Sequence, residues 1–396
     1  MLRIFAVAIG AALLAVPARA QDRWVGSWAT SQQIPEERNA LGPHDLDDAT
    51  LRQTVHLSID GARLRVRLSN AFGTAPLHIA AAHIARGLPG SDAIEAGSDT
   101  TLRFSGVPNV TIPAGADYVS DPVAFAGRDI AISLYFDKAP AQQTSHPGSR
   151  TTSYLMHGNH VSDASLAGAV KFDHWFNIAG IDVSSGKGAV TVVGDSITDG
   201  RGSTTNGNDR WTDALAQRLR AGKIAVGVLN HGIGGGRILQ DGLGPNAMSR
   251  FDRDVLAQPG AHWLIVFEAI NDIGTFDPDG TKPKAAHDEL IRQLTTAYAQ
   301  MIEKAHAAGL KIYGATITPF MDCGPYHPKP VSEADRVAVN VWIRAHFDAV
   351  LDFDAVVRDP ARPDHLAAAY DSGDGLHLSP AGYRVLANAV PLSLFQ

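Results

Sequence analysis

The sequence predicts two structural parts, an all-β half followed by an α/β half built on a parallel sheet. From Gln21 to about Gly186, short stretches alternate apolar and polar residues and are separated by turn residues. From about Ala189, short apolar runs alternate instead with longer helical stretches. Hydrophobic residues make up 45% of the 396 residues and charged residues 19%, a globular composition. We therefore expect domains at 21–186 and 187–396.

Strand patterns dominate the first half. Alternation is clearest in Arg63–Leu68, where every second residue is apolar, and it recurs less strictly in 54–59 and 129–136. Turn clusters such as Asp60-Gly61 and Pro89-Gly90 separate these runs. Many short strands with frequent turns predict an antiparallel sandwich or a jelly roll.

The second half repeats a strand–helix alternation. Apolar runs typical of strands covered on both faces lie at 189–193, 224–229, 261–267, 311–317 and 350–353. Helical patterns lie at 209–221, 285–308, 332–347 and 381–390, with Ser332 expected to cap the third of these helices. In such sheets the working residues sit beyond the carboxyl ends of the strands.

Charge and cysteine content exclude several classes of protein. The 34 basic and 41 acidic residues give a formal net charge of -7, which argues against a nucleic-acid partner held by phosphate contacts. The single cysteine, Cys323, can form neither an internal disulfide nor a cysteine-based zinc site, and we expect a packed thiol.

Residues 1–20 have the features of a signal peptide. A positive start at Arg3 precedes the apolar run 4–16, and Ala18 and Ala20 occupy the -3 and -1 positions of a cleavage site. The run is too short to span a bilayer comfortably, so we expect no stable membrane anchor. We predict cleavage before Gln21 and a secreted or periplasmic protein.

Four polar segments follow strands or precede a helix in the second half. They are 194–200 (GDSITDG), 230–237 (NHGIGGGR), 268–272 (EAIND) and 374–377 (DGLH). Ser196 is placed to be a nucleophile, which needs a base to be activated. His377 can be that base with Asp374 as its partner, because side chains three apart share one face of a helical turn. The amide of Asn271 can donate to a developing oxyanion.

Each segment alone has an ordinary explanation as a turn or a helix cap. Together they resemble the SGNH, or GDSL-type, hydrolase superfamily, whose four signature residues match Ser196, Gly235, Asn271 and His377 in chain order. The resemblance implies a flavodoxin-like three-layer fold and ester hydrolysis without a metal ion or cofactor. Ser196 would attack, His377 would carry the proton and Asp374 would orient it.

The same resemblance implies an oxyanion hole made of the Ser196 and Gly235 N–H groups and the Asn271 side chain. Gly234 and Gly236 adjoin Gly235, so the choice of glycine stays open. The sequence departs from the family at Ala269, where glycine is usual. Glu268, Arg237 and Tyr326 are placed near these segments and could line the cleft.

The first half looks like the β-domain that precedes this catalytic domain in some exported, carbohydrate-directed esterases. The segments that carry this likeness are 24–30 (WVGSWAT) and 52–55 (RQTV). Trp24 and Trp28 could stack on a sugar, although core positions are commoner for tryptophan. His157 and His160 could be a metal pair, but a polar loop explains them better.

We therefore expect an exported serine esterase that hydrolyses short acyl esters, such as acetyl groups on a polysaccharide. Hydrolysis of lipid or aryl esters is the alternative within the enzyme class. A carbohydrate-binding protein with an inactive hydrolase half is the alternative outside that class.

Overall fold

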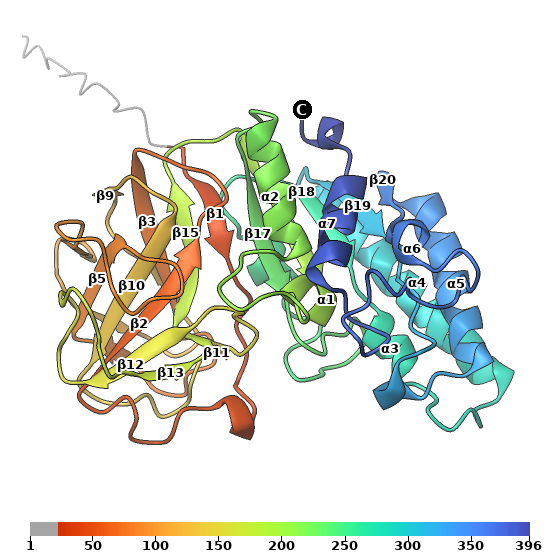
Figure 1. Ribbon diagram of the computed structural model, residues 1–396, viewed down its shortest axis with the longest axis horizontal. Helices are drawn as coiled ribbons and strands as arrows, with labels where there is room; N and C mark the ends of the chain where they lie inside the picture. Colours follow the sequence, from red (N-terminus) through yellow and green to blue (C-terminus); the bar gives the residue numbers. More distant parts are fainter. Residues whose placement is uncertain (1–22) are drawn as a thin grey trace, which may run out of the picture.

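The computed structural model describes residues 23–396, so the predicted signal peptide lies outside the described residues. Figure 1 shows two regions side by side, one made of strands and one made of a sheet with helices around it. We call residues 23–186 the β-rich half and residues 187–396 the α/β half. Strand β15 ends at Val183 and β16 begins at Gly188, and the exact domain limits stay a prediction.

Two antiparallel sheets make up most of the β-rich half. One has the order β1-β15-β3-β8, with β9 also pairing β3, and the other has the order β13-β12-β2-β10-β5-β6. The strands are β1 (Val25–Ala29), β2 (Ala49–His56), β3 (Arg63–Ser69), β5 (Ala81–Arg86), β6 (Thr100–Thr101), β8 (Asp117–Val119), β9 (Val123–Ala124), β10 (Asp129–Phe136), β12 (Ser153–His157), β13 (Val170–Phe172) and β15 (Ile178–Val183). Two further pairs join β4 (Leu77–Ile79) to β7 (Val110–Ile112) and β11 (Ser145–His146) to β14 (Trp175–Phe176).

Both sheets contribute to one hydrophobic core. In β3 the apolar positions Leu64, Val66 and Leu68 are buried in it, as the alternation predicts. Strand β2 starts at Ala49, earlier than the expected Thr54, because it lies between β10 and β12 and also buries polar residues. Arg52 is buried there and donates to the carbonyl of Asp92 at 2.7 Å. Many antiparallel strands confirm the β-rich prediction, and the choice between sandwich and jelly roll stays a prediction.

The α/β half contains a parallel sheet of five strands in the order β17-β16-β18-β19-β20, which confirms the predicted parallel sheet. Its strands are β16 (Gly188–Gly194), β17 (Val226–Gly232), β18 (Ala261–Phe267), β19 (Lys311–Ala315) and β20 (Ala349–Leu351). The helices are α1 (Ser196–Asp199), α2 (Trp211–Ala221), α3 (Ile270–Gly274), α4 (Lys284–Ala307), α5 (Pro330–His346), α6 (Phe353–Val357) and α7 (Pro380–Ala389). Single turns of helix are η1 (Glu37–Asn39), η2 (Asp252–Leu256), η3 (Gly324–Tyr326) and η4 (Leu392–Phe395).

All four predicted helices begin one or two residues from the expected position, and two of them begin at a proline. Helix α5 begins at Pro330 with Lys329 as its N-cap, and Ser332 accepts the Lys329 N–H at 3.2 Å from inside the first turn. Helix α7 begins at Pro380, and the side chain of Ser379 caps it by accepting from the Gly382 N–H. In the first turn of a helix the backbone N–H groups have no partner within the helix, so a proline, which lacks this group, can be the first helical residue.

The strand order places a crevice at the carboxyl ends of β16 and β18. In an order of this kind the connections leave the two central strands toward opposite faces of the sheet, which opens a site between them. Every residue of β16 is buried, as expected for a strand covered on both faces. Residues 195–200 follow β16 and residues 268–272 follow β18, so both segments meet at this crevice.

The β-rich half packs against the edge of the parallel sheet. Strand β1 lies beside β17 in Figure 1, and the Gly26 N–H donates to the Pro259 carbonyl at 2.8 Å. Ala189 and Leu229 of the α/β half are buried in the core of the β-rich half. Among residues 23–396, no helix combines the length and the apolar character needed to cross a membrane.

Candidate active site

Ser196 lies at a sharp turn between β16 and α1. The side chain of Asp195 caps this helix by accepting the Ile197 N–H at 2.8 Å, and Gly200 ends it in the left-handed region with φ 102°. The short helix points Ser196 into the crevice, where its side chain lines the cleft described below. Only 7% of the residue is exposed, so bulk water has little access to its hydroxyl.

A chain of two hydrogen bonds joins Ser196 to His377 and Asp374. Ser196 Oγ lies 2.7 Å from His377 Nε2, and His377 Nδ1 lies 2.7 Å from Asp374 Oδ2. The other oxygen, Asp374 Oδ1, accepts the backbone N–H of His377 at 2.8 Å. Burial raises the pKa of Asp374, but the ring and backbone hydrogen bonds from His377 outweigh it and hold that pKa well below its usual range. Asp374 therefore stays ionised beside the imidazole.

Asn271 lies in α3 with its amide oriented by two partners. Its Nδ2 donates to the Gly236 carbonyl at 2.7 Å, and its Oδ1 accepts from the hydroxyl of Tyr326. One of the two amide hydrogens is thus left over, and the residue lines the same cleft as Ser196. Burial raises the pKa of Tyr326, so this hydroxyl remains a donor at neutral pH.

The three glycines after β17 differ in whether they face the cleft. The Gly236 N–H donates to the Ile233 carbonyl at 2.9 Å and is therefore occupied within its own turn. Gly234 and Gly235 line the cleft, and Gly235 has φ 66°, a conformation that favours glycine. The open choice among three glycines thus narrows to Gly234 and Gly235.

Buried acids lie beneath Asn271. Asp195 and Glu268 are both 1% exposed and lie within hydrogen-bonding reach of each other, and Asp272 is close by. Burial and the neighbouring negative charge raise the pKa of both Asp195 and Glu268. Burial also raises the pKa of Asp272 to about 6, although it accepts the N–H groups of Ile238 and Leu239. A proton shared by Asp195 and Glu268 turns their repulsion into a hydrogen bond.

The departure at Ala269 has a structural consequence. Ala269 is buried and has φ 90°, in the left-handed region where glycine is favoured and an L side chain is strained. The turn that begins α3 therefore keeps the backbone shape typical of glycine, and the methyl group lies in the core instead of narrowing the cleft.

Ser196 opens onto a cleft of about 520 Å³ with walls from both halves. This volume lies within the range of small-molecule sites. The α/β half contributes Ser196, Asp199, Arg201, Gly234, Gly235, Leu243, Asn271, Tyr326 and His377. The β-rich half contributes Gln33, Glu36, Arg38, Asn39, Pro147, Gly148, Arg150, Asp173 and His174.

Sequence reasoning found the residues around Ser196 but missed the wall from the β-rich half. Residues 147–150 carry no motif and lie about fifty positions before Ser196, so only the packing of the two halves brings them to it. Of the residues expected near the site, Tyr326 lines the cleft. Arg237 is not among the lining residues, and Glu268 lies buried beneath them.

Several other expectations can be checked against the structure. Trp28 is buried and packs edge-to-face on Trp175 at 4.9 Å, so it cannot stack on a sugar. Cys323 is buried, which raises the pKa of its thiol. His160 contacts Asp163 and the His157 carbonyl. Asp371, the other acid near His377, accepts the N–H groups of Gly373 and Gly375.

Residues 192–385 match the GDSL-like Lipase/Acylhydrolase family. Solved structures similar to the chain include an acetylxylan esterase from Geobacillus stearothermophilus, with 19% identity, 52% of this chain and 93% of that chain covered, and a TM-score of 0.38. A lipase/acylhydrolase from Enterococcus faecalis also has 19% identity, with 51% and 92% covered and a TM-score of 0.38. A GDSL-like lipase from Bacteroides thetaiotaomicron has 17% identity, with 51% and 84% covered and a TM-score of 0.37.

No curated protein sequence matches the chain significantly. The α/β half belongs to the GDSL-like lipase/acylhydrolase family and is a carboxylic ester hydrolase domain.

Proposed function

We propose that this ester hydrolase domain uses Ser196, His377 and Asp374 as a catalytic triad. The observation that supports it most is the pair of 2.7 Å contacts from Ser196 Oγ to His377 Nε2 and from His377 Nδ1 to Asp374 Oδ2. A serine hydroxyl is a poor nucleophile at neutral pH until a base takes its proton. The ionised Asp374 accepts a hydrogen bond from Nδ1–H, which leaves Nε2 free to act as that base.

The reaction then follows from these contacts. Ser196 Oγ bonds to the ester carbonyl carbon while its proton passes to His377 Nε2. The carbonyl oxygen becomes an oxyanion, which the N–H groups of Ser196 and Gly235 and the spare Asn271 amide hydrogen stabilise. His377 returns the proton to the leaving alcohol, and an acyl group remains on Ser196. Water, deprotonated by His377, releases the acid and restores the serine.

The lining of the cleft supports a short acyl group joined to a polar alcohol. Charged and polar side chains such as Glu36, Arg38, Asp173, His174 and Arg201 surround the opening, whereas large apolar side chains are few. A long acyl chain would leave these polar groups desolvated without partners, which is costly. We therefore favour acetyl-type esters of a carbohydrate, such as an acetylated polysaccharide, over lipid esters. The sequence of residues 1–20 supports export as the route to such a substrate.

The test is turnover of 4-nitrophenyl acetate by the mature chain and by Ser196→Ala. Ser196→Ala should reduce turnover to the uncatalysed background and keep the thermal melting profile, because the hydroxyl contributes little to the core. A fluorophosphonate reagent should add its mass to the parent protein and not to the variant. Residual activity well above background would reject Ser196 as the nucleophile. A series of acyl lengths, with acetylated xylan beside it, then ranks the substrate classes.

A further inference from the structure

Arg150 reaches the cleft from the β-rich half. It lies in the loop between β11 and β12, and it lines the same cleft as Ser196 and Asn271. Its backbone has φ 51°, an unusual conformation for a residue other than glycine, and its carbonyl accepts the Asn206 N–H at 2.9 Å. A strained backbone held by a contact with the other half often marks a position kept for function.

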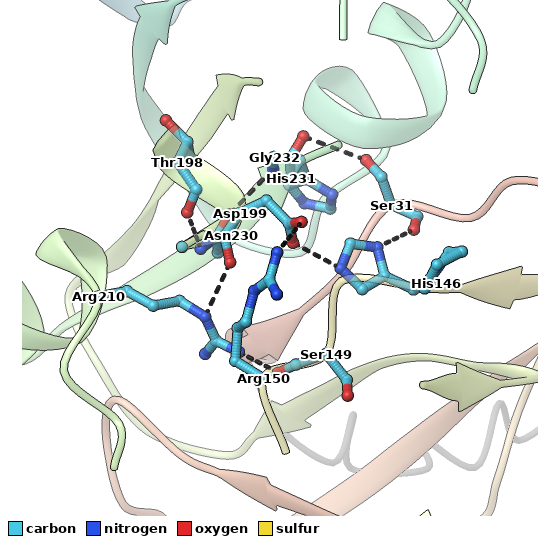
Figure 2. Close-up of polar contacts among 12 residues, drawn as sticks. Ser31, His146, Ser149, Arg150, Thr198, Asp199, Arg210, Asn230, His231 and Gly232 are labelled. Carbon is cyan, nitrogen blue, oxygen red and sulfur yellow. Dashed lines mark hydrogen bonds and ion pairs between the residues drawn. The ribbon is translucent and has the colours of Figure 1, made fainter. Parts of the chain in front are cut away.

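Neighbouring residues fix this loop to the α/β half (Figure 2). The Arg210 guanidinium donates to the Ser149 carbonyl and, through Nε, to the Asp199 carbonyl at 3.0 Å. Asp199 ends the helix that Ser196 begins. The loop that carries Arg150 is therefore bound to the segment that carries the nucleophile, so its place in the cleft is set before a ligand arrives.

His146 occupies one side of the Asp199 carboxylate. Its Nε2 lies 2.9 Å from Asp199 Oδ1, and its Nδ1 lies 2.9 Å from the Ser31 carbonyl oxygen, as Figure 2 shows. His146 thus occupies Asp199 Oδ1 and leaves Oδ2 facing Arg150.

Arg150 therefore keeps donors available for a ligand. Its Nη2 is 3.7 Å from Asp199 Oδ2, which is an ion pair but too long for a hydrogen bond. Its Nε is buried and cannot meet a ligand, whereas 31% of the side chain is exposed, which leaves the terminal nitrogens as its donors toward the cleft. Gly148 lies against the Asp199 carboxylate, where a β-carbon would collide with it. Asp199 thus orients the guanidinium without occupying its donors.

We propose that Arg150, oriented by Asp199, binds oxygen atoms of the alcohol part of the ester and makes the enzyme selective for esters of polyhydroxylated alcohols. The planar guanidinium offers several donors in a fixed geometry, which suits neighbouring hydroxyl or ring oxygens of a sugar. The β-rich half then supplies substrate selection for chemistry that the α/β half performs. This inference rests on the proposed function.

The test compares Arg150→Gln and Arg150→Lys with the parent on two substrates. One is 4-nitrophenyl acetate, whose alcohol carries no hydroxyl groups beside the ester, and the other is an acetylated xylo-oligosaccharide. Arg150→Gln should lower kcat/KM for the oligosaccharide by roughly 10- to 100-fold, as expected for a hydrogen bond to a charged donor. Its effect on kcat/KM for 4-nitrophenyl acetate should be at least several-fold smaller than its effect on the oligosaccharide, because that alcohol offers no hydroxyl group to the guanidinium. Arg150→Lys keeps the positive charge, so its kcat/KM for the oligosaccharide should fall less than that of Arg150→Gln.

Arg292→Gln is the matched control, because Arg292 is exposed on α4 and pairs with Glu289 of the same helix. This control should leave kcat/KM unchanged for both substrates. Equal losses on both substrates, or no loss on either, for a folded Arg150→Gln would overturn the inference. If Arg150→Gln fails to fold, a selective loss in Arg150→Lys supports the inference and an unselective result overturns it. A parent protein inactive on 4-nitrophenyl acetate would instead contradict the proposed function.

Discussion

Two acidic segments flank Ser196, and they have opposite electrostatic characters. In residues 374–377, Asp374 has 36% of its side chain exposed and accepts hydrogen bonds from the ring and backbone of His377. In residues 268–272, Glu268 is buried with neither carboxylate oxygen hydrogen-bonded to a donor, and its nearest cation, Arg250, is 3.9 Å away. The same functional group is therefore ionised in one segment and favours its protonated form in the other.

The difference indicates that hydrogen-bond donors, and not residue type, decide the protonation state of an acid near Ser196. Donors hold the pKa of Asp374 low, so its negative charge is available to a protonated His377. Burial beside Asp195 raises the pKa of Glu268, so that segment adds little negative charge close to Asn271, the proposed oxyanion donor. An uncompensated negative charge there would oppose the developing oxyanion.

The first test of this difference removes the negative charge of Asp374. Asp374→Asn should lower kcat by on the order of 10³–10⁴, because the imidazole loses its orienting acceptor and its charge partner. Steady-state kinetics on 4-nitrophenyl acetate measure the loss. Asp371→Asn is the matched control, since Asp371 contacts backbone N–H groups of the same loop. If the two variants lost similar activity, Asp374 would only support the loop.

The second test concerns the donor in the buried segment. Asn271→Ala should lower kcat by on the order of 10²–10³ with a smaller change in KM, because the amide acts on charge that appears in the transition state. Tyr326→Phe keeps the Asn271 amide but removes the hydroxyl that orients it, so kcat should fall by roughly tenfold or less. A change confined to KM in Asn271→Ala would show that Asn271 binds the ester in its ground state.

The meeting of Ser196, Asn271 and His377 could be predicted from sequence for a physical reason. Parallel strands end at one edge of the sheet, so the polar residues that follow β16 and β18 must gather there. The pairing of Asp374 with His377 needs only their spacing of three residues. These relations are local or follow from the topology alone.

The cleft wall from the β-rich half could not be predicted in this way. Arg150 and His146 reach Asp199 only because β1 packs along β17, and interdomain packing leaves no periodic signal in sequence. Asp199 itself lies in the segment 194–200, which contains Ser196 but gives no sign of a partner about fifty residues earlier. The pKa difference between Asp374 and Glu268 likewise depends on burial that the sequence does not display.

The third test removes a titrating group from the buried segment and measures how stability then depends on pH. Native Asp272 keeps its proton up to about pH 6, whereas the unfolded chain releases it near pH 4, so stability declines as the pH rises through this window. Asp195 and Glu268 act in the same direction, because their pKa values are also raised. Glu268→Gln lets an amide donate to Asp195 at any pH. It should be more stable than the parent at pH 8, by about 1–2 kcal/mol, and similar at pH 4.

Thermal melting of both proteins between pH 4 and pH 8 measures this effect. Glu303→Gln is the matched control, since Glu303 is exposed on α4 and its substitution should leave the pH profile unchanged. A Glu268→Gln variant that melted lower than the parent at pH 8 would mean that ionised Glu268 is stabilised by Arg250 after all.

The smallest expected effect is at Ala269, which starts the buried segment with φ 90°. Replacement by glycine relieves a strain of about 1–2 kcal/mol. It also removes a buried methyl group, worth about 0.8 kcal/mol, and adds freedom to the unfolded chain. These contributions oppose one another, so Ala269→Gly should melt close to the parent. Ala315→Gly in β19 also removes a buried methyl group and adds freedom to the unfolded chain, but it relieves no backbone strain. It should therefore melt about 1–3 °C lower than the parent. Equal losses in the two variants would show that the turn at Ala269 stores no strain.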